Sequence, residues 1–270
     1  MISPESRPWS NSSRSSLANV ILAISTSTPQ FSLALVDESG VLLAEWTLLP
    51  RTKGFRHFMT ALDHLLRLSG VALEEIRGLA VAKGPGSFTG LRVGLSAAKG
   101  FCEGLGVPIV ALSSLEILAS QCPAVSIPVC PVIGSRKEEV FAALYSWSEE
   151  QRLVRLEPET CLKIRDLPEF MKKRAFVLGT DFNRQMGPIA LAAGDRAVFA
   201  PPSFWNLRAA TLGMLAARRA RDQGFDSVQE VVPSYLRSPD IRPNPYPPAP
   251  SLSVTEDKNI DNSRGKDHNL

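Results

Sequence analysis

The chain has 270 residues, of which 44% are hydrophobic and 21% charged, with a formal net charge of +3. These values are typical of a globular protein and exclude a chain that is disordered throughout. The longest apolar run is far shorter than the roughly 20 residues that a membrane-spanning helix needs, so we expect no contact with a membrane. The small net charge also lacks the strong basic excess of a nucleic-acid-binding protein.

The cysteine and histidine positions predict no metal site. The cysteines form no Cys-x-x-Cys pair, and two of the histidines, His57 and His64, are seven residues apart. On a helix that separation is roughly 10 Å, which is too far for both rings to bind one ion. We interpret the four cysteines as free buried thiols in a reducing compartment.

Both ends of the chain differ in composition from the middle. Residues 1–18 are polar and rich in serine, and residues 241–270 open with several prolines and then turn polar. Neither end has enough apolar surface to offset the entropy lost on folding, so we predict that both are disordered. The folded part is expected over residues 19–240.

The first half of this part alternates between apolar runs and helical periodicity. The apolar segments 20–26, 31–36 and 41–48 are separated by short turns and predict an antiparallel meander. Over 55–68 the apolar residues recur at helical spacing. The further elements expected here are a strand at 78–82, a helix at 91–105, a strand at 108–111 and a helix at 114–121 capped by Ser113.

From residue 127 the same kind of pattern starts again in a shorter and less regular form. Strands are predicted at 129–133, 140–145 and 176–179, and helices at 166–172, 183–193 and 206–223. Three strands followed by alternating helices and strands is the order of an actin, Hsp70 or sugar-kinase half-domain. We therefore predict an α/β chain with two related half-domains, over 19–126 and 127–240. Four arginines on the last helix predict a solvated basic face: Arg208, Arg218, Arg219 and Arg221.

The most informative segment is KGPGSFTGLRVG at 83–94, which follows an apolar strand and opens a helix. Its glycines permit positive φ and close backbone approach, and the helix start offers free N–H groups that could bind an anion. The alternative is a tight turn that lets the helix sit close to its sheet. The segment is not a Walker A motif, because no Gly-Lys-Ser/Thr ending is present.

This segment resembles the signature of the TsaB family, the smaller actin-like subunit that pairs with the catalytic subunit TsaD in bacterial tRNA threonylcarbamoyladenosine synthesis. ILAISTSTPQFSLALVDESG resembles the family's first hairpin, VPIVALSSLEILA its next strand and capped helix, and PVIGSRKEEVFAALY a segment of its second half. VVPSYLRSPD is similar to the family's closing Pro-x-Tyr-Leu-Arg. The resemblance covers roughly residues 20–240, with 150–230 matching loosely.

The resemblance implies an actin-like (ASKHA) fold and a cytoplasmic, non-catalytic scaffold subunit for TsaD, working with the ATPase TsaE. It implies a homodimer when the chain is alone, indirect or weak tRNA contact, and no cofactor of its own, with ATP or ADP considered at the partner interface. The expected partner surface is Phe55, Phe58, Met59, Leu62, Leu91, Gly94, Ala97 and Ala98. The expected signature loop, considered for phosphate or nucleotide contact, is Gly84, Pro85, Gly86, Ser87, Phe88, Thr89, Gly90 and Arg92.

Two departures from the family pattern bear on catalysis. Ser25 stands where the family has a first-strand aspartate, and Gly134 stands where it has a second one. In actin-like ATPases and kinases such carboxylates handle Mg²⁺, for which a serine hydroxyl is a much poorer ligand. These losses favour the scaffold interpretation over the alternative, an independent actin-like ATPase or small-molecule kinase. A peptidase has no support, because no Ser-His-Asp or Cys-His set is visible.

Overall fold

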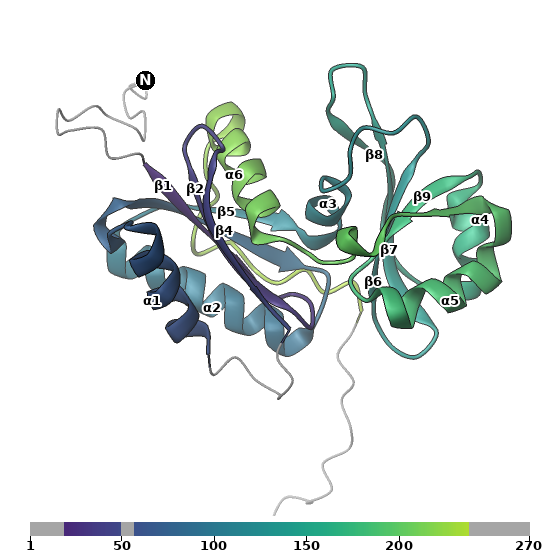
Figure 1. Cartoon of the computed structure of the whole chain (residues 1–270), viewed down its shortest axis with the longest axis horizontal. Coiled ribbons are helices and arrows are strands. Elements are labelled where there is room, and N and C mark those ends of the chain that lie inside the picture. Colours follow the sequence, from purple (N-terminus) through teal and green to yellow (C-terminus); the bar gives the residue numbers. More distant parts are fainter. Residues whose placement is uncertain (1–18, 50–56, 238–270) are drawn as a thin grey trace, which may run out of the picture. The chain divides into compact units, whose positions relative to one another are not determined.

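The structure, a computed structural model, describes residues 19–49 and 57–237. Within these ranges the chain forms two five-stranded mixed sheets with helices packed against them (Figure 1). Short 3₁₀ helices lie at Leu73–Glu75, Ile164–Asp166, Gly194–Arg196 and Pro202–Phe204. The predicted disordered ends fall outside the described residues.

The first sheet has the strand order β3-β2-β1-β4-β5. Its members are β1 (Val20–Ser25), β2 (Phe31–Asp37), β3 (Leu42–Leu48), β4 (Ile76–Gly84) and β5 (Ile109–Ser113). β1, β2 and β3 pair antiparallel, which confirms the predicted meander. β4 is parallel to β1, and β5 is parallel to β4, so these three strands end at the same edge of the sheet.

The second sheet repeats this topology. Its members are β6 (Val129–Gly134), β7 (Glu139–Trp147), β8 (Leu153–Lys163), β9 (Ala175–Leu178) and β10 (Ala197–Phe199), in the order β10-β9-β6-β7-β8. The first three pair antiparallel, and β9 and β10 are added in parallel beyond β6. The chain therefore contains one arrangement of five strands twice. The sequence pattern predicted two related halves, but only three of the five strands in the second.

Helices cover both faces of the first sheet: α1 (Phe58–Ser69), α2 (Phe88–Leu105) and α6 (Ala209–Gln223). Successive side chains of a strand point to opposite faces, and β1 shows the result. Leu22 and Ile24 pack in the core formed with α1 and α2, whereas Ile21 and Ala23 pack in the core formed with α6. Figure 1 shows α1 and α2 on one face and α6 on the other. β1 is a continuous apolar run because both of its faces are buried.

The helices of the second sheet are α3 (Ser114–Ala119), α4 (Leu167–Met171) and α5 (Phe182–Ala193). The core beside them includes Trp205, whose indole N–H donates to the Ala200 carbonyl oxygen at 3.0 Å. Gly179 makes room for this ring, because a Cβ there would lie 2.7 Å from it. Burial of the whole indole with its one donor satisfied makes Trp205 a fixed point of this core.

Three features differ from the sequence prediction. The helix expected at 206–223 forms as α6, but it packs on the first sheet and not on the second. Strands β8 and β10 were not predicted. Arg208 and Arg219, expected on a solvated face, bind Glu45 and Asp226. The bounds of the two half-domains stay a prediction.

Candidate functional site

The signature loop (residues 84–90) joins the end of β4 to the start of α2. Ser87 caps the helix, and its hydroxyl oxygen accepts a hydrogen bond from the Gly90 N–H at 3.2 Å. The Ser87 N–H donates to the Ser27 carbonyl oxygen at 2.7 Å. This hydrogen bond holds the loop against the turn that follows β1. Ser27 and Ser87 are 60 residues apart in the sequence.

Three glycines of the signature segment (residues 83–94) lie so close to this turn that a side chain would clash with it. A Cβ at Gly86 would lie 2.0 Å from the Ser27 carbonyl oxygen, and one at Gly90 would lie 2.0 Å from the Thr26 carbonyl oxygen. A Cβ at Gly94 would lie 2.2 Å from the Thr26 hydroxyl oxygen. Real Cβ atoms do not approach so closely, so each glycine is required by packing within the chain.

This geometry favours the second of the two interpretations of the loop, a turn that brings a helix close to its sheet. It accounts for the glycines without a ligand. Contact of the loop with phosphate or nucleotide stays a prediction. The turn itself is buried: Ser25, Thr26, Ser27 and Thr28 are each at most 2% exposed.

The C-terminal segment 231–237, called the closing segment below, crosses the signature loop. The Ser234 N–H donates to the Lys83 carbonyl oxygen at 2.7 Å. The Arg92 guanidinium lies over the Phe88 ring at 3.9 Å, and its Nε donates to the Tyr235 hydroxyl oxygen at 3.3 Å. Two motifs that are far apart in the sequence thus meet in one cluster. Arg92 contacts both motifs and so holds them together.

The structure corrects most of the expected partner surface. The side chains of Phe58, Leu62, Leu91 and Ala98 are at most 5% exposed, and Gly94 is buried against Thr26. They contribute to the core of the first sheet, because the apolar stripe of a helix packs on the sheet it covers. Met59 is 61% exposed and Ala97 is half-buried. Phe55 lies outside the described residues.

The two positions that lack the family's aspartates lie at strand ends. Ser25 closes β1, and its buried hydroxyl oxygen has no hydrogen-bond partner in the part of the chain that the structure describes. Gly134 closes β6 and is exposed. Since a lone hydroxyl and a glycine offer no carboxylate, neither position supplies a ligand suited to Mg²⁺.

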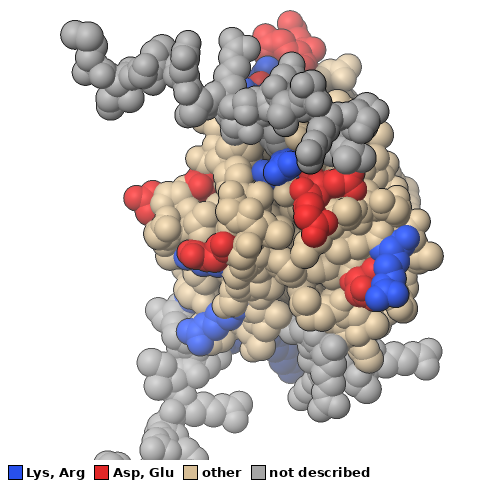
Figure 2. Space-filling model, turned by 90° about the vertical axis from the view of Figure 1, so that its left-hand side faces the viewer, with Lys and Arg blue, Asp and Glu red and all other residues tan. Residues whose placement is uncertain are grey.

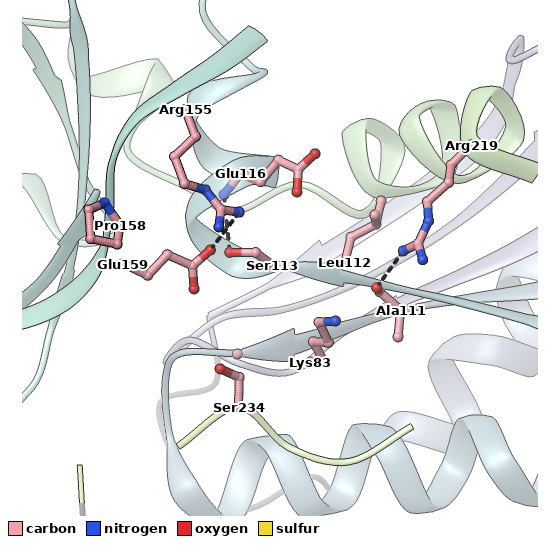
Figure 3. A pocket seen from close by; sticks show the side chains of 11 residues that line it. Lys83, Ala111, Leu112, Ser113, Glu116, Arg155, Pro158, Glu159, Arg219 and Ser234 are labelled. Atoms are coloured by element: carbon pink, nitrogen blue, oxygen red, sulfur yellow. Dashed lines mark hydrogen bonds and ion pairs between the residues drawn. The ribbon is translucent and has the colours of Figure 1, made fainter. Parts of the chain in front are cut away.

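A polar pocket with a volume of about 340 Å³ opens beside the signature loop (Figure 3). Its walls come from the ends of β4 and β5, from α3, α6 and β8, and from the closing segment. Polar side chains in its lining are Lys83, Ser113, Glu116, Arg155, Glu159, Arg219 and Ser234. Sequence reasoning missed this pocket because its lining comes from elements that are separate in the sequence and that only the fold brings together.

The Glu116 side chain lines this pocket from the first turn of α3. Ser113 does cap α3, accepting from the N–H groups of Leu115 and Glu116. Burial raises the pKa of the Glu116 carboxyl, and the nearby charge of Arg155 opposes that rise. Keeping this carboxylate charged at its buried position is therefore costly.

The charged side chains that are visible at the α1 end of the first sheet are few and scattered. Figure 2 shows small groups of both signs on a largely uncharged surface, and no broad area of one sign. In residues 19–49 and 57–237, no group of three or more His, Cys, Asp and Glu side chains could hold a metal ion. No helix of the same residues is long and apolar enough to cross a membrane.

Comparison with known proteins identifies the family. A family model described as TsaD, tRNA N6-adenosine threonylcarbamoyltransferase, matches residues 55–241. The tRNA threonylcarbamoyladenosine biosynthesis protein TsaB of Bacillus subtilis (strain 168) is 30% identical over 220 residues, which cover 80% of this chain and 93% of that protein. The chain belongs to the TsaB family. It also belongs to the wider family that the TsaD model describes.

Further TsaB proteins and a solved structure agree with this assignment. TsaB of Escherichia coli (strain K12) is 34% identical over 147 residues, which cover 52% of this chain and 63% of that one. A crystal structure from Pseudomonas aeruginosa, described as an uncharacterized protein similar to the peptidase YeaZ, superposes with a TM-score of 0.68. It is 24% identical and covers 81% of this chain and all of that one. The predicted actin-like α/β fold is confirmed.

This member of the TsaB family contains the signature segment, and three glycines of that segment are explained by packing within the chain. Its curated relatives are named for tRNA threonylcarbamoyladenosine biosynthesis.

Proposed function

We propose that this chain is a cytoplasmic, non-catalytic scaffold subunit that pairs with TsaD and supports its transfer of threonylcarbamoyl to tRNA adenosine. The observation that carries the proposal is the outward face of α2. Ser96, Gly100 and Gly104 are exposed there at intervals of four residues, which place them on one side of a helix.

Gly100 and Gly104 have no packing reason within the described residues. A Cβ at either position would meet no atom within 4 Å, in contrast to Gly90 and Gly94 of the same helix. Glycine in a helix interior is less stable than alanine by about 0.5–1 kcal/mol, so two such residues need another explanation. Close approach of a helix from a second subunit supplies it, because the shortest helix–helix distances need small residues at the contact.

The exposed side chains of α1 extend this surface. Met59 is 61% and Leu68 is 81% exposed, and α1 and α2 cover the same face of the first sheet. Apolar side chains beside a smooth helix face are the composition expected at a subunit contact. The same surface serves a homodimer when TsaD is absent, in this proposal.

The site at the strand ends supports the non-catalytic role. Ser25 and Gly134 replace the carboxylates that phosphoryl chemistry in this fold uses, and the glycines of the signature loop pack against the chain's own turn. In this proposal the partner holds the metal and the activated threonylcarbamoyl group. Any ATP or ADP lies at the interface with the partner, TsaE belongs to the larger complex, and tRNA contact by this chain is indirect.

The test is co-elution of this chain with its TsaD on size exclusion, with and without TsaE and nucleotide. Gly100→Ala and Gly100→Gln are compared because both add a Cβ, but only the glutamine side chain is large enough to fill the space between the two helices. We expect the glutamine variant to remain monomeric and folded while losing TsaD.

Failure of the unaltered chain to co-elute under every condition would overturn the proposal, as would hydrolysis of Mg-ATP or modification of tRNA by the isolated chain. Gly187→Ala on α5, another exposed helical glycine with no atom near its Cβ position, is the control and should leave pairing unchanged.

A further inference from the structure

The polar pocket beside the signature loop is lined by charged side chains, and not all of them form ion pairs in the described part of the chain. Arg219 is fixed by the Asp226 carboxylate at 2.7 Å and by the Ala111 carbonyl oxygen at 3.0 Å. Arg155 forms an ion pair with Glu159 at 3.4 Å. Each guanidinium group thus has a carboxylate partner within the chain.

Lys83 and Glu116 are left as two opposite charges without an ion pair in the described part of the chain. They come from different elements, the end of β4 and α3, and both line the pocket. Figure 3 shows them at opposite sides of the pocket, with Ser113 between β5 and α3. Lys83 acts electrostatically on Glu116 and lowers its pKa against the larger effect of burial.

The pocket also offers a hydroxyl donor. Ser113 Oγ accepts hydrogen bonds from two backbone N–H groups, which leaves its own proton free to donate. The lining therefore presents an ammonium, a carboxylate and a hydroxyl to one space.

We propose that this pocket binds a small zwitterion the size of an α-amino acid, with its carboxylate on Lys83 and its ammonium on Glu116. A volume of about 340 Å³ holds several water molecules of roughly 30 Å³ each and so has room for such a ligand. Each charge of the ligand would pair with a side chain that forms no ion pair in the described part of the chain.

A phosphate or another dianion fits the same lining poorly. Glu116 and Glu159 both face the pocket, and Lys83 is the cation there that lacks an ion pair in the described residues. Because Arg155 and Arg219 already pair with Glu159 and Asp226, a dianion would gain the Lys83 ammonium and also meet the unpaired Glu116 carboxylate. A zwitterion has a partner for each of its charges.

The experiment uses the native chain and matched ligands. Binding of glycine, L-serine and L-glutamine is measured by saturation-transfer NMR and by thermal unfolding at millimolar ligand. Glycine methyl ester lacks the carboxylate charge and N-acetylglycine lacks the ammonium charge. We expect at least one amino acid to bind and to raise the melting temperature, and both half-charged analogues to fail. Inorganic phosphate is expected to fail as well.

Variants then assign the binding to this pocket. Lys83→Met and Glu116→Gln should each raise the Kd by at least about tenfold. Lys137→Met and Glu149→Gln remove the same charges from exposed positions and should leave the Kd unchanged. Circular dichroism checks that each variant is folded, and the ligand analogues decide the matter on the native chain if one is not.

Three outcomes would overturn the proposal. One is that none of the amino acids binds. The second is that acetylglycine or phosphate binds as well as the amino acids, which would show a plain anion pocket. The third is unchanged amino-acid affinity in both folded pocket variants. None of these measurements involves TsaD, so their failure leaves the scaffold role untouched, and loss of the scaffold role leaves them valid.

Discussion

The Thr26 hydroxyl donates a hydrogen bond to the Gly90 carbonyl oxygen, with 2.7 Å between the two oxygens. Sixty-four residues separate the two in the sequence. The bond joins the turn after β1 to the first turn of α2, at a place where the glycine has no side chain to keep them apart. The signature segment is thus half of a contact whose other half lies in the first hairpin.

Glycine substitutions along α2 should therefore have opposite effects on stability. Gly94→Ala places a Cβ against the Thr26 hydroxyl and should lower the free energy of unfolding by about 1–3 kcal/mol. Gly100→Ala meets open space and should raise it by about 0.5–1 kcal/mol. Urea unfolding followed by circular dichroism measures both. Equal effects at the two positions would show that α2 is not held against the turn.

Asp226 should be sensitive to loss of its charge. Its carboxylate accepts from the Ala111 N–H and from the Arg219 guanidinium, each at 2.7 Å, and it is about three-quarters buried. Asp226→Asn should lower the free energy of unfolding by about 1–3 kcal/mol. Asp222→Asn is the control, since Asp222 is more exposed and its ion pairs are near 4 Å, and it should change stability by less than about 0.5 kcal/mol. A smaller loss for Asp226 than for Asp222 would contradict this.

Glu116 should make stability depend on pH. Its folded-state pKa is raised above the ordinary value of 4.5, chiefly by burial, so the folded chain holds this proton more tightly than the unfolded chain does. The resulting stability is fully present below pH 4.5 and is lost as the pH rises through the folded-state pKa. The charged groups that act on this carboxyl are Arg155, Glu159, Arg219 and Lys83.

The measurement is the difference in unfolding free energy between the native chain and Glu116→Gln across that pH range. We expect the native chain to lose stability relative to the variant as the pH rises, because glutamine does not titrate. A difference that stays constant, or that grows in favour of the native chain, would contradict the direction of the shift.

Removal of the Tyr235 ring should loosen the closing segment. The centroids of the Tyr235 and Phe88 rings lie 5.2 Å apart, and the Tyr235 hydroxyl oxygen accepts a hydrogen bond from Arg92. Tyr235→Ala should lower the free energy of unfolding by about 0.5–1.5 kcal/mol. It should also speed hydrogen exchange at the Ser234 N–H, which donates to the Lys83 carbonyl oxygen. Tyr235→Phe keeps the ring and should retain most of the protection. Unchanged exchange in the alanine variant would show that the ring does not hold the segment.

Local sequence was sufficient for the elements with the strongest periodicity. β1 is predicted at 20–26 and observed as Val20–Ser25, and α2 is predicted at 91–105 and observed as Phe88–Leu105. The signature segment also led to the right family, because its residue pattern is specific. Strand β8 was missed because most of its side chains are exposed or half-buried, so the sequence shows no clean alternation there.

What the sequence by itself determined, then, was a repeated α/β pattern, a family and a glycine-rich segment of unknown purpose. The tertiary structure decided that three of those glycines meet the Thr26–Ser27 turn, that Leu62 and Ala98 face the core, and that α6 returns to the first sheet. It also brought Lys83 and Glu116 to one pocket. The physical reason is that periodicity reports which side of an element is apolar, whereas its neighbours there come from distant parts of the chain and are fixed only by packing.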